Sequence, residues 1–364
     1  MELLSPQLAG WIVVGLLLVW LTLGVHIGVA LGLAGFLGIY LTVGSDAALA
    51  QISTIPFSTT NSFTLAVIPL FILMGSFATV AALIPPSILM VVYAVITEQS
   101  IGKLLIAGIV PGILTAVIYC AGIYVIARVR PDIAPLANIA FTWKERFRSL
   151  YSVYGIIILF ALVVGGIYGG YFPATYAGAV GAFGAFVIAL IKGRMGMKSL
   201  VEVLKEAAVT TSVIFIIVIG GIIFARFLTY SGLVDVISVG LLGMGSGKYV
   251  YLLGFVVLFL VLGCFLEPIA IMVMTLPIMF PVMVKAGFDP IWLGVVAVKL
   301  AEISVLTPPV GLNVFVVKSA SPVPVTLGQA FAGVTPFIIL DLFSLVLYVL
   351  FPGMLLWLPN LVQS

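Results

Sequence analysis

Two proline pairs stand inside very apolar segments, in "IPPS" at 84–87 and in "TPPVGLN" at 307–313. A proline removes a backbone donor and clashes with the preceding turn, so a pair ends or breaks a helix. In hydrocarbon, each freed carbonyl is costly unless a partner satisfies it. Freed carbonyls suit a small hard cation, and the positive end of the half-helix that follows suits a carboxylate. The two breaks together therefore predict a binding site, whereas one pair alone is also compatible with a simple kink.

A third segment, "GCFLEPIAIMVMTLPIMFP" at 263–281, combines prolines with polar side chains and predicts a re-entrant hairpin. Glu267 within it is a functional hypothesis by default, because it is ionisable; capping of a helix start is the equal alternative. The predicted substrate- and ion-binding residues are Gly263, Glu267, Thr275, Thr307, Pro308, Pro309, Gly311, Asn313, Pro85, Pro86 and Ser87. Oxygen ligands beside a helix break predict sodium, with Thr307 and Asn313 as its side-chain ligands.

Four further ionisable residues lie in apolar runs. Lys299 and Glu302 are three residues apart, so they could pair across one helix. For Arg226 and Asp341, extension to a helix end or a tertiary pair is favoured over contact with a substrate. These four residues are therefore less informative than the broken segments.

Several other chemistries are excluded by the sequence. "GMGSGKY" at 243–249 looks like a phosphate-binding loop, but Leu242 occupies the position of the first glycine, and no Ser or Thr follows the lysine. His26 is the single histidine and cannot form a histidine-based metal site alone. Cys120 and Cys264 lie in apolar runs and indicate neither a disulfide nor a metal site. We see no catalytic triad, and we expect neither an enzyme nor a cofactor.

Membrane helices must position these residues. The chain has 364 residues, of which 63% are hydrophobic and 7% charged, whereas a soluble domain is about one quarter charged. The apolar runs lack the alternation of a membrane barrel, so we expect an all-α polytopic membrane protein with a retained first span. Runs long enough to span a bilayer lie near 8–24, 26–44, 63–83, 103–127, 151–168, 173–191, 208–230, 248–266, 290–305 and 326–352. Shorter, broken segments lie near 84–97, 232–246, 268–284 and 309–320.

Basic residues concentrate in two segments, 128–148 and 192–206. Two spans separate them, so both segments fall on one side of the membrane, and the positive-inside rule makes that side cytoplasmic. Binding of "WKERFR" to anionic lipid or to nucleic acid is the weaker alternative. We expect the lipid bilayer as a partner and no nucleic acid.

The chain also repeats itself, and the order of the repeated stretches is the same in both halves. The pairs are 70–77 with 258–265, 84–95 with 307–318, and 107–111 with 332–336. Paired, broken apolar segments are the sequence sign of an inverted-repeat secondary transporter. Gly75 and Gly263 lie 188 residues apart, whereas Pro86 and Pro309 lie 223 apart. The first half is therefore 35 residues shorter between these landmarks.

The chain resembles the large membrane subunit of the tripartite ATP-independent periplasmic (TRAP) transporters over nearly its whole length. The joint presence of "TEQSIGKL", "FDPIW" and "TPPVGLN" makes the resemblance specific. It implies a sodium-driven importer of organic acids, such as C4-dicarboxylates or sialic acid, in a bacterial inner membrane. It also implies a periplasmic substrate-binding protein, a small membrane subunit and elevator-type movement, as in the ion transporter superfamily. By matching motif, 267–275 belongs to the second hairpin and 308–313 to the broken helix beside it.

The chain departs from this family where the first hairpin is expected, between Gly75 and Pro85, and at Tyr176, where the family usually has a glutamate. Because that hairpin would supply half of the substrate pocket, we expect this form to insert but to transport poorly. An ion channel and a non-transporting relic are the alternative functions. The predicted divisions are N-terminal scaffold helices at 1–62, a shortened first repeat of a transport domain at 63–127, connecting and scaffold helices at 128–247, a second repeat at 248–345 and a C-terminal end at 346–364.

Overall fold

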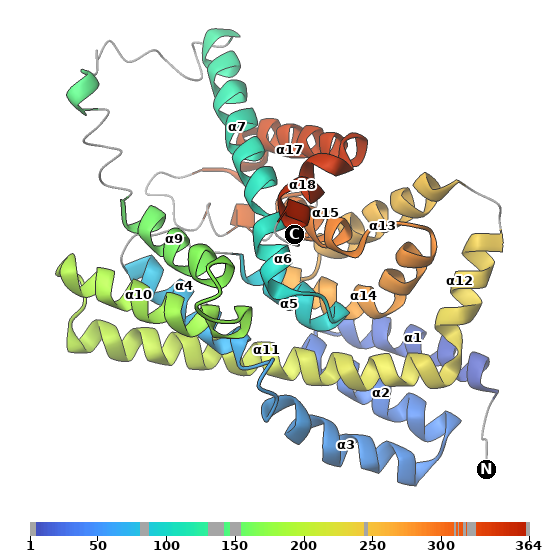
Figure 1. Cartoon of the computed structure of the whole chain (residues 1–364). Helices are drawn as coiled ribbons and strands as arrows, with labels where there is room; N and C mark the ends of the chain where they lie inside the picture. The colour runs from blue at the N-terminus through green and yellow to red at the C-terminus, as the bar shows by residue number, and fades with distance from the viewer. Residues whose placement is uncertain are drawn as a thin grey trace.

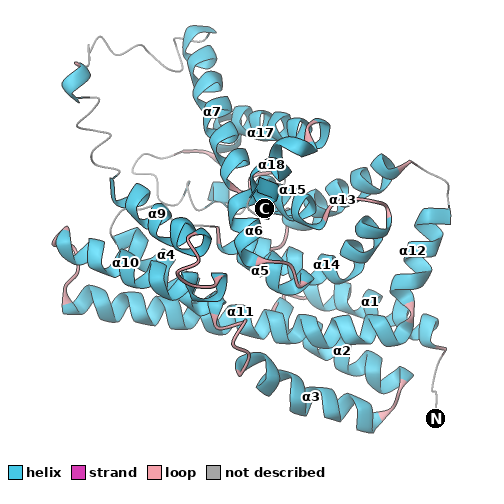
Figure 2. Cartoon of the chain, in the orientation of Figure 1, coloured by secondary structure: helices cyan, strands magenta, loops and turns pink. Residues whose placement is uncertain are grey.

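The computed structural model describes residues 5–80, 87–129, 142–145, 154–243, 247–308, 311, 313–315, 318 and 325–361. Within these residues all regular structure is helical (Figure 2), which confirms the expected all-α class. Five segments are long and apolar enough to cross a membrane: Ile101–Val129, Ala174–Ile191, Met197–Ser231, Pro268–Lys285 and Leu327–Leu350. The expectation of a polytopic membrane protein is therefore confirmed.

One group of helices assembles on the longest helix of the chain (Figure 1). Its members are α1 (Pro6–Thr22), α2 (Ile27–Thr42), α3 (Ser45–Thr60) and α11 (Met197–Ser231). The 35 residues of α11 extend over about 52 Å, at about 1.5 Å per residue. Glycine allows α2 and α11 to touch backbone to backbone, because a Cβ at Gly220 would overlap the carbonyl of Gly28.

A second group packs on the N-terminal part of α11. It contains α4 (Val67–Val80), α9 (Tyr154–Tyr168), the short 3-10 helix η1 (Ala174–Tyr176) and α10 (Ala177–Ile191). The ammonium of Lys192 lies 5.5 Å from the ring centroid of Tyr154. The start of α9 and the end of α10 therefore lie close together. This is the arrangement expected if the two basic segments, which adjoin these helix ends, lie on the same side of the membrane.

The third group forms the centre of the molecule. It contains α5 (Ile88–Thr97), α13 (Lys248–Gly263), α14 (Pro268–Lys285) and α15 (Pro290–Ser304). Asp289 caps α15 by accepting the backbone N–H groups of Ile291 and Trp292, at 2.8 and 2.9 Å. Every residue of α15 is buried except Pro290 and Glu302. A helix that is buried on all sides, with one exposed carboxylate, is the structural core of this protein.

The remaining helices cover this centre. They are α6 (Ile101–Ala107), α7 (Ile109–Val129), α12 (Leu233–Gly243), α17 (Leu327–Leu350) and α18 (Pro352–Leu361). The helices α7 and α17 lie side by side (Figure 1), with the Tyr119 and Phe337 rings in edge contact at 5.5 Å. The helix α7 begins within the repeated stretch 107–111, and α17 contains the stretch 332–336, so the helices that follow equivalent positions in the two halves pack on each other.

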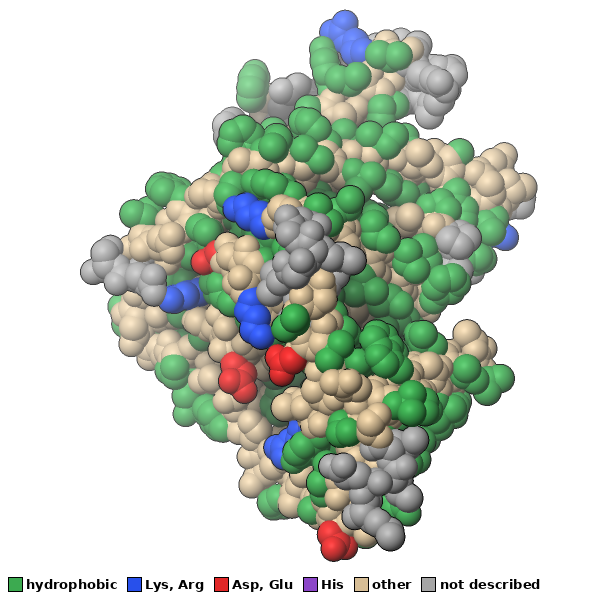
Figure 3. Space-filling model, turned by 90° about the vertical axis from the view of Figure 1, so that its right-hand side faces the viewer, with side chains coloured by type: hydrophobic (Ala, Val, Ile, Leu, Met, Phe, Trp, Pro, Cys, Tyr) green, Lys and Arg blue, Asp and Glu red, His purple; other side chains and the backbone are tan. Residues whose placement is uncertain are grey.

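The outer surface of the described residues is rich in large exposed hydrophobic side chains, as a lipid-facing surface requires. Examples are Trp11 and Leu18 on α1, and Ile113 and Val117 on α7. On the face drawn in Figure 3, hydrophobic side chains are widespread and the few charged ones gather mainly in one part. The surface therefore fits the lipid bilayer that the composition predicted.

Several predicted boundaries differ from the structure. The helix α3 was not predicted, because its sequence is rich in Ser and Thr; these side chains bond to backbone carbonyls of the preceding turn, as Thr54 does to Ala50 at 2.6 Å. The span expected at 208–230 begins already at Met197, so most of the second basic segment is helical. The segment expected to break near Pro277 continues as one helix, because burial of α14 outweighs the proline penalty.

Candidate functional site

The turn after α13 meets the end of α15. Gly263, the last residue of α13, lies so close to Ser304 that a Cβ at 263 would overlap the serine hydroxyl. The Cys264 sulfur lies 3.4 Å from the Pro308 carbonyl oxygen and 3.2 Å from the Leu260 carbonyl oxygen of its own helix. Two of the predicted segments, 263–267 and 307–313, are thus brought together although they are far apart in the sequence.

After α15 ends at Ser304, the backbone forms tight turns. The Thr307 N–H donates to the Ser304 carbonyl at 3.1 Å, and the Thr307 hydroxyl donates to the Ile303 carbonyl at 2.8 Å. The Asn313 N–H returns to the Val305 carbonyl at 3.2 Å. Gly311 has φ +58° and touches the Phe331 ring, so both its backbone angle and its surroundings require glycine. The predicted break is therefore present, and Pro309 within it lies outside the described residues.

The exposed groups at this break have the chemistry of a cation site. The Asn313 side chain is exposed, and the Thr307 hydroxyl gives its hydrogen to a carbonyl, so its lone pairs remain available as acceptors. The Pro308 carbonyl oxygen lies near the thiol of Cys264, a weak donor whose single hydrogen it shares with the nearer Leu260 carbonyl. Carbonyl, hydroxyl and amide oxygens are the ligands that hard cations prefer.

The other predicted site residues do not join this cluster. Glu267 occupies the N-cap position of α14, but its exposed side chain makes no capping hydrogen bond. Thr275 is buried inside α14 and donates to the Ile271 carbonyl at 2.7 Å. Ser87 occupies the N-cap position of α5 and faces a separate cavity. Pro85 and Pro86 lie outside the described residues.

The larger of two cavities that have some polar lining residues, with a volume of about 710 Å³, lies between α5, α11, α14 and the segment 61–66. Its polar lining residues are Ser62, Thr64, Glu98, Gln99 and Arg226. The Arg226 guanidinium donates to the Gln51 side-chain oxygen of α3 at 2.7 Å. The expectation of a tertiary pair for Arg226 is confirmed, but its position in a cavity was missed, because nothing in the sequence indicates which face of α11 meets α14.

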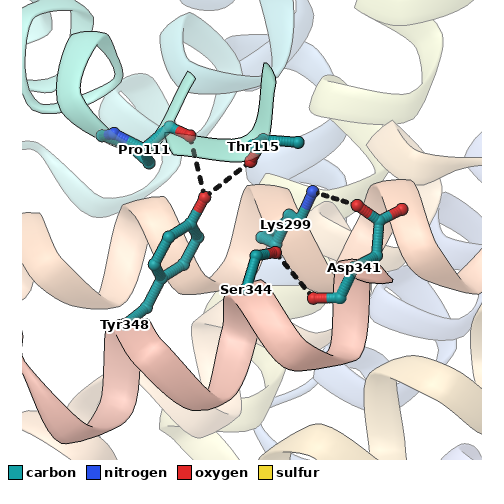
Figure 4. Close-up of polar contacts among 6 residues, drawn as sticks. All are labelled: Pro111, Thr115, Lys299, Asp341, Ser344 and Tyr348. Atoms are coloured by element: carbon teal, nitrogen blue, oxygen red, sulfur yellow. Dashed lines mark hydrogen bonds and ion pairs between the residues drawn. The ribbon is translucent and has the colours of Figure 1, made fainter. Parts of the chain in front are cut away.

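The second cavity, of about 440 Å³, contains Ser87 and residues of α6, α7, α9, α15 and α17. At its edge, the Lys299 ammonium lies 2.5 Å from the Asp341 carboxylate (Figure 4), and their side chains are only 7% and 3% exposed. The pair of Lys299 with Glu302 that their spacing allows is therefore not formed. The buried face of α15 turns Lys299 toward α17, and the tertiary partner replaces the local one.

The Tyr348 side chain of α17 lines this cavity and forms hydrogen bonds with α7 (Figure 4). The Tyr348 hydroxyl donates to the Pro111 carbonyl at 3.0 Å and lies 2.9 Å from the Thr115 hydroxyl. A carbonyl can only accept, so Tyr348 uses its single hydrogen there and Thr115 donates to Tyr348. No group of three or more His, Cys, Asp or Glu side chains comes together in the described part of the chain.

Comparisons with known proteins agree with one another. The family model described as "Tripartite ATP-independent periplasmic transporter, DctM component" matches residues 76–354. The C4-dicarboxylate TRAP transporter large permease protein DctM of Pseudomonas aeruginosa is 36% identical over 283 residues, which cover 78% of this chain and 65% of that protein. The sialic acid TRAP transporter large permease protein SiaM of Vibrio cholerae is 31% identical over 285 residues, with the same coverage, 78% and 65%.

A third relative is the ectoine/5-hydroxyectoine TRAP transporter large permease protein UehC of Ruegeria pomeroyi. It is 31% identical over 289 residues, which cover 78% of this chain and 66% of that protein. The chain thus spans about two thirds of the length of the curated relatives it matches. All three relatives are named as permeases, and none is named as an enzyme.

Proposed function

Because the chain belongs to the DctM family of TRAP transporters, as a multi-pass protein of the bacterial inner membrane, we propose that it imports organic acids together with sodium. The named relatives carry C4-dicarboxylates, sialic acid and ectoines, so a carboxylate is the proposed substrate class. The observation that carries this proposal is the break after α15. It lies beside the turn between α13 and α14, where Gly263 contacts Ser304 and Cys264 contacts Pro308.

The break supports a sodium site. In secondary transporters, unwound backbone carbonyls and the ends of half-helices coordinate the coupling ion. Here Thr307, Pro308 and Asn313 follow the end of a buried helix, and Gly311 lets the chain turn so that the Asn313 N–H reaches the Val305 carbonyl. We propose that these residues bind sodium and that no other cofactor takes part.

The larger cavity supports a site for an anionic substrate. Its volume of about 710 Å³ lies within the usual range for small-molecule pockets, about 300–1,000 Å³. Arg226 supplies a guanidinium that is paired with the neutral amide of Gln51, and a guanidinium binds a carboxylate through two parallel hydrogen bonds. We propose that Arg226 holds the substrate carboxylate, with Ser62 and Gln99 as further polar contacts.

The position of this cavity supports the proposed elevator. It lies between α11, which belongs to the predicted scaffold at 128–247, and α14, which belongs to the predicted transport domain at 248–345. A site at such a boundary becomes exposed to either side when one body slides along the other. The proposed partners are a periplasmic substrate-binding protein and a small membrane subunit, as the tripartite name of the family implies.

One observation favours a second function, that of a relic which inserts but does not transport. Only residues 81–87 separate α4 from α5, whereas the equivalent interval in the second half holds the two helices α14 and α15. The first half therefore has no counterpart of α15, which forms the core, or of α14, which borders the larger cavity. Without that counterpart the chain cannot enclose a substrate from both sides.

Uptake into proteoliposomes separates these functions. The purified chain, reconstituted with a small subunit and a binding protein from a relative, would be tested with a labelled C4-dicarboxylate under a sodium or a potassium gradient. Saturable uptake that requires sodium and is lost in Asn313→Leu supports the importer. Uptake that keeps its sodium dependence in Asn313→Leu contradicts the proposed sodium site.

Two further results of the same assay identify the alternatives. Flux that does not saturate and needs no binding protein indicates a channel. Insertion without uptake, rescued by a hairpin from a relative placed between residues 83 and 84, indicates a truncated transporter.

A further inference from the structure

The larger cavity contains a carboxylate that the proposed substrate site does not use. Glu98, the C-cap residue of α5, lines this cavity and has φ +55°. Among the residues that the structure describes, no other residue except glycine has a positive φ. Helices that end in this left-handed conformation usually have glycine or asparagine there, because a larger side chain costs free energy.

The fold does not explain why a glutamate occupies this turn. The turn is closed by the backbone, since the Gln99 N–H donates to the Ala94 carbonyl at 2.8 Å. The exposed Glu98 carboxylate takes part in no hydrogen bond or ion pair within the described part of the chain. A residue that is kept in an unfavourable conformation without a structural contact is a candidate for a function.

The cavity presents one charge of each sign. Of the described residues that line it, only Glu98 of α5 and Arg226 of α11 are charged. They do not neutralise each other, because neither of the two ion pairs in the described part of the chain includes them. Arg226 is hydrogen-bonded to the neutral amide of Gln51 instead. The net charge of the lining is therefore zero, with the two charges held apart on different helices.

This arrangement discriminates between classes of carboxylate. A dicarboxylate places one charge on Arg226 and brings its second charge into the same cavity as Glu98, where like charges repel. A monocarboxylate compensates Arg226 and leaves Glu98 without a partner. A molecule with one carboxylate and one cationic group compensates both charges. The apolar lining at Ile222, Val273 and Pro277 suits the hydrocarbon between the two groups.

We infer that the cavity selects a zwitterion, with Glu98 as the specificity-determining residue that binds the cationic group of the substrate. This inference rests on the proposed function, because it takes Arg226 as the ligand of the substrate carboxylate. It adds a role for Glu98, and it makes a dicarboxylate the weaker ligand of this site.

Direct binding of matched probes tests the inference without transport. Binding of radiolabelled probes to the purified full chain would be measured in detergent and sodium chloride. One set has the length of four carbons: γ-aminobutyrate as the zwitterion, succinate as the dianion and butyrate as the monoanion. A longer set contains ε-aminocaproate, adipate and hexanoate, because the site selects the separation of the two charges as well as their signs. In one of the sets, the zwitterion is expected to bind about tenfold or more tightly than the two anions.

Variants of Glu98 show whether this residue causes the preference. Glu98→Gly removes the carboxylate and suits the positive φ, so the unfolding temperature is expected to be maintained while the advantage of the zwitterion is lost. Glu98→Lys reverses the charge and is expected to make the dianion the tightest ligand. Glu202→Gln is the matched control, because Glu202 is an exposed carboxylate of α11 that does not line the cavity. The preference is expected to remain unchanged in this control.

The outcomes separate this inference from the proposed function. A preference for the zwitterion that is lost in Glu98→Gly and kept in Glu202→Gln supports the inference. It is overturned if a dianion binds at least as tightly as the zwitterion of its length, or if the preference survives in Glu98→Gly. In both of these cases, loss of binding in Arg226→Gln leaves the proposed carboxylate site standing. Absence of binding by every probe contradicts the inference and the carboxylate site together.

Discussion

Lys299 and Asp341 form a buried ion pair that joins α15 to α17, with the ammonium 2.5 Å from the carboxylate. The two residues are 42 positions apart in the sequence, and both lie in apolar runs. A buried pair offsets the desolvation of its two charges only when the geometry is good, and removal of one partner leaves the other charge uncompensated. This contact therefore controls how α17 is held on the core.

The first prediction concerns the stability of this pair. Lys299→Met leaves Asp341 unpaired and is expected to lower the free energy of unfolding by about 3–5 kcal/mol. Asp341→Asn is expected to lower the free energy of unfolding by a smaller amount, because the Lys299 ammonium can pair with Glu302 on the same helix. Thermal unfolding of the two variants in detergent measures the difference. Equal losses in both variants would contradict this account of the pair.

The second prediction compares two glycines of one helix, α13. Gly263→Ala places a methyl group against Ser304, so α13 and α15 must separate, at an expected cost of about 1–3 kcal/mol. At Gly254 no atom lies within 4 Å of the position that a Cβ would take, and Gly254→Ala is expected to be neutral or to stabilise the helix by up to about 1 kcal/mol. The expected result is a lower unfolding temperature for Gly263→Ala and an unchanged or higher one for Gly254→Ala. A neutral Gly263→Ala would show that the close approach of the two helices is dispensable.

The third prediction concerns Arg226 in the larger cavity. Arg226→Gln removes the guanidinium and is expected to raise the KM for a carboxylate substrate by about tenfold or more. Arg226→Lys keeps the charge but loses the two parallel hydrogen bonds, so an intermediate effect is expected. Gln51→Ala is the control, because it removes the partner of Arg226 and leaves the charge in the cavity. Substrate affinity unchanged in Arg226→Gln would exclude this residue from the site.

The fourth prediction concerns the side of the membrane. Cysteines would be placed at Ser149 and at the exposed Lys198, after replacement of both native cysteines by serine. Both new cysteines are expected to resist an impermeant thiol reagent in intact cells and to react after lysis, because both segments are basic. Reaction in intact cells at either position would reverse the assigned orientation.

The sequence predicted the main helices and the break, and it missed features that depend on tertiary packing. The helix-breaking chemistry of Pro308 and Gly311 is local, so it can be predicted from residue type. The partner of Lys299 could not be predicted in this way. Local spacing favoured Glu302, and only the packing of α17 on α15 brings Asp341 close.

In the candidate site, too, local features were predicted from the sequence and tertiary contacts were not. The contact of Cys264 with Pro308 joins two segments that were predicted separately as functional, but their proximity follows from the packing of α13 on α15. Arg226 was set aside because a charge near a helix end has several ordinary explanations. Its place in a cavity depends on the rotation of α11 relative to α14, which one sequence does not specify.

The short connection between α4 and α5 has a consequence for the transport cycle. In a transporter built from two inverted repeats, the inward-open state can be derived from the outward-open state by exchanging the conformations of the two halves. Here α14 and α15 occur in the second half alone, so they have no twin with which to exchange. If the protein alternates between two such states, we expect its two halves to move unequally, because α14 and α15 have no counterpart in the first half.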